Sequence, residues 1–312
     1  GAEVGRTGVM GDSAIAQALS TLKRFKALCD QMQVSETLVV ATAAVRDAAN
    51  GKEFVDLIRR ETGFEIAVIE GDEEARLAGL GVLSSEPEAF GIVGDLGGGS
   101  LELAQVQNGA VLQTISLPLG PLRLISKFGN NPRTIKKYLR AQFSEIDWLN
   151  QVEDQSLYMV GGAWRNIAKL MMREKSNPLP ILQGYKSSRS ELIAYCKRLS
   201  NLDAQNIPFA SDMPARRVEV LPTAAIILQE LLSAMRAKNG LVSVYGLREG
   251  LIFDQLSLAE KQSDPFLHVC CVLADERCRF AEHADVIYDW TRPLFKKEVR
   301  NPEQQRKLHY AI

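Results

Sequence analysis

A run of three glycines followed by a serine, between two apolar stretches rich in β-forming residues, is the feature that most constrains this sequence. The four residues are Gly97, Gly98, Gly99 and Ser100. Consecutive glycines disfavour a helix or a strand because glycine loses more backbone freedom on folding than any other residue. The run therefore predicts a turn between two strands, and the bare N–H groups of such a turn can bind an anion, most often a phosphate.

Two acidic residues flank this turn, Asp95 at the end of the first predicted strand and Glu102 within the second. Carboxylates in these positions would repel a phosphate unless a divalent cation lay between them. The stretch therefore favours a site that binds phosphate together with Mg²⁺. A glycine-rich β-hairpin with solvated acids is the alternative interpretation.

The composition is that of an ordinary soluble protein. The 312 residues are 46% hydrophobic and 24% charged, which predicts about two globular domains. The formal net charge of −1 gives no reason to expect a nucleic acid or a membrane as partner, so an anion site must be built locally. No apolar run approaches the length of a membrane-spanning helix, and no signal peptide is evident. The first residue is Gly1 rather than Met, so we expect a piece of a longer protein.

Histidine and cysteine narrow the possible chemistry. The three histidines, His268, His283 and His309, lie near the end of the chain, so the body of the protein contains none. Histidine is the commonest general base, and its absence excludes a Ser-His-Asp triad there and leaves proton transfer to carboxylates. The five cysteines form no CxxC pair and no zinc-type spacing, which favours reduced thiols and a cytoplasmic protein.

Hydrophobic periodicity predicts alternating helices and strands at the start of the chain, then a strand–turn–strand unit, and so an α/β domain with a mixed sheet. Asn108-Gly109 is a hairpin turn signal that extends this unit to three antiparallel strands. From about residue 265 the pattern is entirely helical. The predicted helices are 13–29, 50–60, 71–83, 133–146, 190–199, 223–235 and one from 164, and the further predicted strands are 37–41, 64–69, 157–160 and 240–245.

An acidic cluster opens the predicted helix that begins at residue 71. It contains Asp72, Glu73 and Glu74. Acids in a first helical turn are favourable because of the helix dipole, and that alone explains the cluster structurally. Adjacent helical residues point about 100° apart, so at most one of Glu73 and Glu74 can face a cleft.

Two further segments could contact an anion. Arg46 lies in a strand-to-helix loop, the kind of place where anions bind, although an ion pair with Asp47 or Glu53 is the alternative. Gly161-Gly162 follows a strand and precedes a helix, as in phosphate loops, although such turns are common. With the acids and the glycine turn, these residues supply what phosphoryl transfer needs, namely donors and cations for the charge and a carboxylate to orient the nucleophile.

Four segments in this order resemble the exopolyphosphatase / guanosine pentaphosphate phosphatase family. They are residues 42–51, 71–76, 95–102 and 246–250. The resemblance runs from about residue 5 to 255 and implies an α/β fold of two actin-like (ribonuclease H-like) ATPase domains with a central cleft. It places these domains at 1–83 and 84–258, and a partial all-helical C-terminal segment at 259–312.

The resemblance also implies roles for the residues singled out above. Glu74 matches the catalytic base that activates water for in-line attack on a terminal phosphoryl group. Asp95 and Glu102 match the acids associated with Mg²⁺, the glycine turn matches a phosphate loop, and Arg46 matches a phosphate-contacting arginine. Gly161 and Gly162 stay candidates for a further phosphate contact.

The activity implied is Mg²⁺-dependent release of terminal phosphate from inorganic polyphosphate, with guanosine pentaphosphate as the alternative substrate, and the resemblance suggests a homodimer. A non-catalytic phosphate or nucleotide sensor and a kinase of the same superfamily are the other possibilities, although the segment 71–76 argues against a kinase. Trp164 and Arg165 stand where relatives often carry small or hydroxyl residues. The family's first phosphate loop, Asp-x-Gly-Ser-Asn-Ser, is not found in this sequence, so we expect turnover by residues 1–312 to be impaired.

Overall fold

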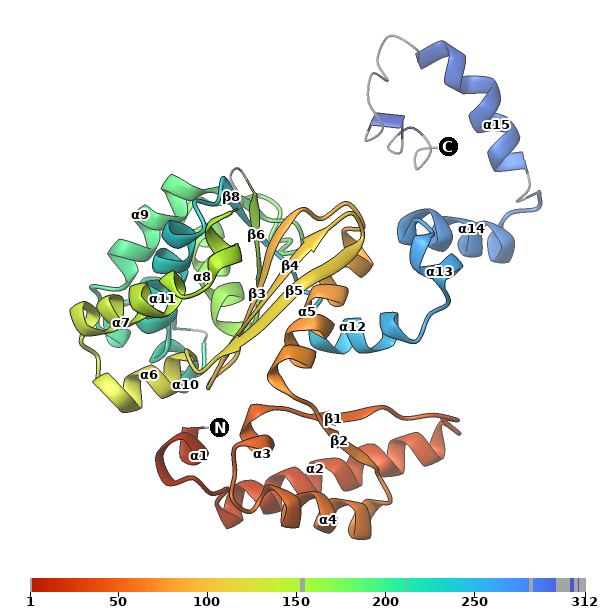
Figure 1. Ribbon diagram of the computed structural model, residues 1–312. Coiled ribbons are helices and arrows are strands. Elements are labelled where there is room, and N and C mark those ends of the chain that lie inside the picture. Colours follow the sequence, from red (N-terminus) through yellow and green to blue (C-terminus); the bar gives the residue numbers. More distant parts are fainter. Residues whose placement is uncertain are drawn as a thin grey trace. The chain divides into compact units, whose positions relative to one another are not determined.

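We describe the protein from a computed structural model that places residues 2–151, 155–211, 213–280 and 283–295, together with 304, 305 and 308. The chain divides into two compact units, Gly1–Asp254 and Gln255–Ile312. The first unit contains all the strands that the structure describes and most of the helices (Figure 1).

The first unit is built from these elements. Its helices are α1 (Ala2–Thr7), α2 (Asp12–Gln31), α3 (Ala43–Arg46), α4 (Gly51–Thr62), α5 (Gly71–Ser85), α6 (Pro121–Phe128), α7 (Pro132–Ser144), α8 (Gly162–Glu174), α9 (Arg189–Leu199), α10 (Ala215–Val218), α11 (Leu221–Ala234) and α12 (Leu247–Asp254). Its strands are β1 (Val39–Ala41), β2 (Ile66–Val68), β3 (Gly91–Leu96), β4 (Leu101–Gln107), β5 (Ala110–Leu117), β6 (Ser156–Val160), β7 (Lys186–Ser188) and β8 (Asn239–Val242), and two short 3₁₀ helices are η1 (Asp147–Asn150) and η2 (Ala204–Asn206).

Six of these strands form one mixed sheet in the order β5-β4-β3-β6-β8-β7. Strands β3, β4 and β5 are sequential and antiparallel, as the sequence predicts, while β3, β6 and β8 run parallel to one another. The turn between β4 and β5 has positive φ at both Asn108 (53°) and Gly109 (73°), as a type I′ hairpin requires. The carboxyl ends of β3, β6 and β8 meet at one edge, which brings the turns that follow them together.

Helices cover both faces of this sheet (Figure 1). On one face α7, α8, α9 and α11 form the larger core, in which Trp164 and Phe143 are fully buried. On the other face α5 packs on β3, β4 and β5, and α12 packs on α5. The mixed α/β architecture expected from the sequence, with helices following it at the C-terminus, is confirmed.

Helices α5 and α12 approach one another through glycines. A Cβ atom at Gly250 would lie 1.8 Å from the carbonyl oxygen of Leu77, and one at Gly81 would lie 2.0 Å from that of Gly246. No side chain fits at either position without moving backbone. Part of the glycine content of segment 246–250 therefore serves helix packing.

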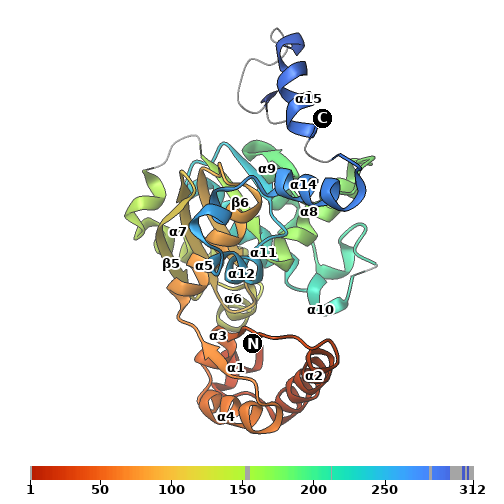
Figure 2. The same cartoon turned by 90° about the vertical axis from the view of Figure 1, so that its right-hand side faces the viewer.

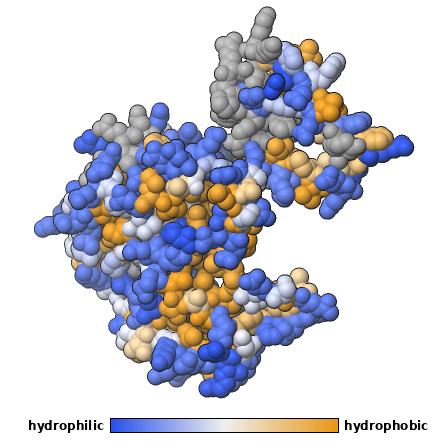
Figure 3. Space-filling view, turned by 45° about the vertical axis from the view of Figure 1, so that its right-hand side comes forward, coloured by the Kyte–Doolittle hydropathy of each residue, from blue (hydrophilic) through white to orange (hydrophobic). Residues whose placement is uncertain are grey.

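The N-terminal lobe (residues 2–69) carries the parallel two-stranded sheet β1-β2 and the helices α1 to α4 (Figure 2). Its small core is Phe54, Ile58 and Phe64. The strands themselves are only partly covered, and Val68 is 40% exposed. On the face shown in Figure 3, hydrophobic residues gather over this lobe, in the lower part of the view.

The sequence pattern does not predict several short elements. Strand β7 is a Lys-Ser-Ser segment with no apolar alternation, and it exists because its backbone pairs with β8 at the sheet edge. Helix α6 begins at Pro121, directly after Gly120, and α10 has only four residues. Such segments carry too little local pattern for a prediction, and tertiary contacts decide their conformation.

The second unit contains helices throughout its described part. These are α13 (Leu258–Gln262), α14 (Pro265–Arg277), α15 (His283–Thr291) and the 3₁₀ helix η3 (Arg292–Phe295). His309 lies outside the described residues. No helix in the described part of the chain is both long enough and apolar enough to span a membrane. The domain boundaries at 83/84 and 258/259 stay predictions.

Candidate active site

The glycine turn and the acidic start of α5 meet at a small cavity of about 130 Å³. Glu74 lines it from the first turn of α5, and the glycine turn, Gly97–Ser100, lines it from the end of β3. The loop from β1 into α3 contributes Thr42, and α6 contributes Arg123. The structure therefore brings the predicted base and the predicted phosphate loop to one place, although they are more than twenty residues apart in the sequence.

The glycine turn presents free backbone donors to this cavity. The N–H of Gly97 donates to the carbonyl oxygen of Ser100 at 3.1 Å and closes the turn. No group in the described part of the chain accepts a hydrogen bond from the N–H of Gly98, Gly99 or Ser100. Amides that line a cavity without a partner are suited to an anionic ligand, as the sequence predicts.

Glu73 and Glu74 have different environments, as expected for adjacent helical residues. The Glu73 carboxylate forms a two-pronged ion pair with Arg76, with both contacts at 2.8 Å. Arg76 also binds Asp254 at 2.7 Å, which ties α5 to α12. Glu73 and Arg76 are therefore structural, and Glu74 is the acid that lines the cavity.

The Glu74 carboxylate is largely buried and incompletely bonded. Its Oε2 atom is buried and has no hydrogen-bond partner, and the cation with which it pairs, Arg46 Nη1, lies 3.8 Å away. Burial raises the pKa of Glu74, and the negative charge of Asp95 adds to this rise, while Arg46 and Thr42 act in the opposite direction. A carboxylate with an unused oxygen and a raised pKa is suited to accept a proton.

Arg46 lies beside the cavity rather than in its lining. Its Nη1 donates to the carbonyl oxygen of Ile69 at 2.8 Å, and its Nε lies 3.6 Å from Asp47 Oδ1, which is the alternative ion pair that the sequence suggested. Arg123, which sequence reasoning missed, does line the cavity and binds the other oxygen of Asp47 at 2.6 Å. No sequence signal marks Arg123, because the pattern does not predict its helix, α6.

Asp95 and Glu102 are direct partners across the antiparallel pair β3–β4, so they share one face of the sheet. Burial raises the pKa of Asp95 to about 6, and Arg165 partly opposes this rise. Burial raises the pKa of Glu102 to about 8, and the charge of Glu74 adds to it, although Ser116 donates a hydrogen bond at 2.9 Å. Two carboxyl groups held from ionising in this way would gain from a cation between them.

The turns after β6 and β8 leave room for Asp95. A Cβ at Gly161 would lie 3.1 Å from Asp95 Oδ1, and φ at Gly161 is +99°, a value that favours glycine. A Cβ at Gly246 would lie 3.7 Å from Asp95 Oδ2. Gly162 has open space around it and lines a second, larger cavity rather than the one that contains Glu74.

The acids fit a shared rather than a self-sufficient metal site. Among the residues that the structure describes, no three His, Cys, Asp or Glu side chains are grouped so as to hold a metal ion. Mg²⁺ is usually bound by one or two carboxylates, with water and substrate phosphates completing its shell. Asp95 and Glu102, with raised pKa values and opposite positions on two strands, match that smaller donor set in number, and they lie behind the glycine turn rather than in the lining of the cavity with Glu74.

Known proteins of similar sequence and fold put this geometry in context. Retrograde regulation protein 2 of Saccharomyces cerevisiae is 28% identical over 281 residues, 81% of this chain and 47% of that protein. Exopolyphosphatase 1 of Mycobacterium tuberculosis (strain H37Rv) is 26% identical over 256 residues, 76% of this chain and 72% of that protein. A Ppx/GppA family structure from Aquifex aeolicus is 27% identical and superposes with a TM-score of 0.66 over 84% of this chain and 87% of that chain.

The chain spans about half the length of the yeast relative. The Aquifex structure shows the same fold over most of this chain, so the fold implied by the resemblance is confirmed. The Ppx/GppA phosphatase family matches residues 1–259, which include all four segments that carried the resemblance. This chain therefore belongs to the Ppx/GppA phosphatase family.

Proposed function

We propose that this protein releases the terminal phosphate of inorganic polyphosphate by hydrolysis, with Glu74 as the general base. One observation carries the proposal: Glu74, whose buried carboxylate has an unbonded oxygen, lines the same small cavity as the free amides of the glycine turn. Membership in a phosphatase family supports hydrolysis, and similarity to an exopolyphosphatase supports the substrate.

Each group of residues in the cavity has a separate role in this reaction. The N–H groups of Gly98, Gly99 and Ser100 bind the oxygens of the terminal phosphoryl group and stabilise charge that develops on them. Glu74 removes a proton from a water molecule as its oxygen forms a bond to phosphorus. The bridging P–O bond on the opposite side breaks, so the products are orthophosphate and a chain shorter by one phosphate. The raised pKa of Glu74 brings the base closer to the working pH.

Asp95 and Glu102 are the residues that would hold Mg²⁺. The ion would supply positive charge against the phosphate oxygens. Its binding would displace the protons that burial favours on these two carboxyl groups, so both would be ionised in the loaded protein. Arg123 and Arg46 add positive charge at the side of the cavity nearest the N-terminal lobe.

Two other functions share this site. Guanosine pentaphosphate also ends in a phosphoanhydride and is the alternative substrate. A regulator that binds a phosphate compound without turnover is favoured by the name of the yeast relative, Retrograde regulation protein 2. A cytoplasmic location and a homodimer stay predictions from the sequence and the resemblance.

Glu74→Gln tests the proposal because it keeps the size of the side chain and removes the base. We expect kcat for phosphate release to fall by about 10²- to 10⁴-fold, the usual contribution of a general base, with little change in KM. Glu73→Gln is the matched control, since it makes the same charge change one residue away, outside the cavity. Turnover by Glu74→Gln at the wild-type rate would falsify the role of Glu74. Binding of polyphosphate without any phosphate release, by a chain that includes the family's first phosphate loop, would favour the regulator.

A further inference from the structure

A second cavity, of about 780 Å³, adjoins the one that contains Glu74. Both cavities are lined by Gly97, Gly98 and Leu122, so the glycine turn forms a wall of each. The cavity with Glu74 is small beside the usual 300–1,000 Å³ of ligand sites, and it has room for the reacting end of a substrate only. The second cavity is within that range.

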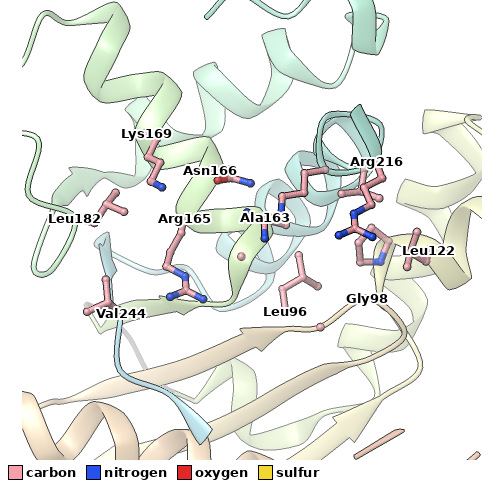
Figure 4. A pocket seen from close by; sticks show the side chains of 15 residues that line it. Leu96, Gly98, Leu122, Ala163, Arg165, Asn166, Lys169, Leu182, Arg216 and Val244 are labelled. Atoms are coloured by element: carbon pink, nitrogen blue, oxygen red, sulfur yellow. The ribbon is translucent and has the colours of Figure 1, made fainter. Parts of the chain in front are cut away.

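Cationic side chains from two helices converge on the second cavity. Arg165 and Lys169 lie on α8 at positions i and i+4, so they share one helix face about 6 Å apart along its axis. Arg216 and Arg217 reach it from α10. Figure 4 shows Arg165, Lys169 and Arg216 arranged around the space beside Gly98. None of the described residues that line the cavity is acidic.

These cations are available to a ligand. Arg165 uses Nε to bond the carbonyl oxygen of Gly161 at 3.2 Å, which leaves its other N–H groups for further contacts. Within the described ranges, Lys169, Arg216 and Arg217 form no ion pair, and all three are exposed. Four like charges around one cavity repel one another unless an anion lies between them. Apolar side chains in the same lining, such as Val220 and Val244, lower the local dielectric and strengthen ionic contacts with such an anion.

We propose that this cavity binds the non-reacting phosphate groups of the substrate, held by Arg165, Lys169, Arg216 and Arg217. The inference rests on the proposed function, since it gives a binding place to the rest of the polyphosphate whose terminal phosphate lies against Glu74. The shared glycine turn makes the two cavities neighbours, so a substrate whose end lies in the first would reach the second with its next phosphates. The cavity thus determines specificity, because a substrate with many phosphates makes more contacts in it than a short one does.

The test measures equilibrium binding by titration calorimetry in the Glu74→Gln background, so that the ligand is not consumed. The ligands are tripolyphosphate, a long inorganic polyphosphate and guanosine pentaphosphate. We expect the double substitution Arg216→Ala/Arg217→Ala to raise Kd for a long phosphate ligand by tenfold or more, since contacts to charged groups are the stronger kind. Tripolyphosphate brings only two non-reacting phosphates to the cavity, so its Kd should rise by a smaller factor. Lys169→Ala should act in the same direction.

Two controls accompany these variants. Lys197→Ala removes an exposed cation from α9, outside both cavities, and should leave every Kd unchanged. Arg216→Lys/Arg217→Lys keeps the charge and should recover at least part of the affinity. Thermal unfolding compares the stability of all variants, and the exposed positions of these side chains make a large loss of stability unexpected.

The outcomes separate the two proposals. Weaker binding of long polyphosphate, of guanosine pentaphosphate or of both supports the cavity assignment, and the ligand affected identifies the source of the phosphates. Equal loss for tripolyphosphate, equal loss in Lys197→Ala, or no loss for any ligand overturns it. Failure of the proposed function would show instead as no phosphate release by a chain that also carries the family's first phosphate loop, a result that leaves these binding measurements fully interpretable.

Discussion

Glu102 offers a sharp test of the site's electrostatics, because the residue is only 2% exposed and its carboxyl group lies near two other acids. Burial raises its pKa from 4.5 to about 8 in the folded protein. Below pH 4.5 the group is neutral in both the folded and the unfolded chain, so it has no effect on stability. Between pH 4.5 and about 8 the unfolded chain loses the proton and the folded chain keeps it, so stability falls as the pH rises.

The size of this effect follows from the shift. At about 1.4 kcal/mol per pH unit, a rise from 4.5 to about 8 corresponds to roughly 5 kcal/mol of lost stability once the pH passes 8. Relaxation and water entry reduce such values, so we expect about 2 to 5 kcal/mol for Glu102 in the metal-free protein. Glu102→Gln abolishes the titration and keeps an oxygen that can accept the hydrogen bond from Ser116.

The assay is urea unfolding followed by circular dichroism at several pH values from 5 to 8, without divalent cations. The free energy of unfolding of the wild type should decline across this range, and that of Glu102→Gln should decline less, by about 2 to 5 kcal/mol. A residual slope from Asp95 and Glu74, whose pKa values are also raised, should persist. Glu36→Gln, at an exposed position before β1, is the control. If Glu102→Gln declines as steeply as the wild type, the argument that burial perturbs Glu102 is wrong.

Three further predictions concern the metal and the packing. Mg²⁺ should raise the thermal midpoint of the wild type more at pH 8 than at pH 6, because it competes with protons for Asp95 and Glu102. In Glu102→Gln this difference between the two pH values should be smaller. An equal rise of the wild-type midpoint at both pH values would count against this site. Gly250→Ala should lower the free energy of unfolding by about 1–3 kcal/mol, because its Cβ would lie 1.8 Å from a backbone oxygen. Gly5→Ala is the control, since a Cβ there meets open space and should leave the stability unchanged. Thermal unfolding measures both variants. Arg140→Ala should lower the free energy of unfolding, measured with urea, by about 1–3 kcal/mol. The reason is that the buried Glu230 carboxylate, which Arg140 binds at 2.7 Å, loses its cation. The double variant with Glu230→Gln should recover part of this loss.

Much of the candidate site can be anticipated from local sequence. The glycine run predicts a turn with free amides, and the acids on either side of it are direct partners in the sheet. The 100° offset between adjacent helical residues is enough to predict that Glu73 and Glu74 have different surroundings. Local chemistry does not decide which of the two faces the cavity, because that depends on how α5 packs against β4, β5 and α12.

Other residues that line the two cavities are not marked by any local sequence signal. Arg123 lines the cavity with Glu74 because α6 contacts α1 of the N-terminal lobe, and Arg46, which the sequence does mark, lies just outside the lining. Lys169 and Arg216 look like ordinary surface cations in the sequence and become neighbours only when α8 and α10 are placed around one cavity.

The sequence by itself determined the order of the longer helices and strands, the hairpin, the phosphate-type turn and the acids around it, since these depend on backbone preferences and on the periodicity of nearby residues. Tertiary structure alone decided that α5 and α12 meet through Gly81 and Gly250, and that four cations from two helices surround one space. The physical reason is distance along the chain: propensity acts within a few residues, whereas a cavity is formed by side chains whose positions are fixed by the packing of the whole sheet and its helices.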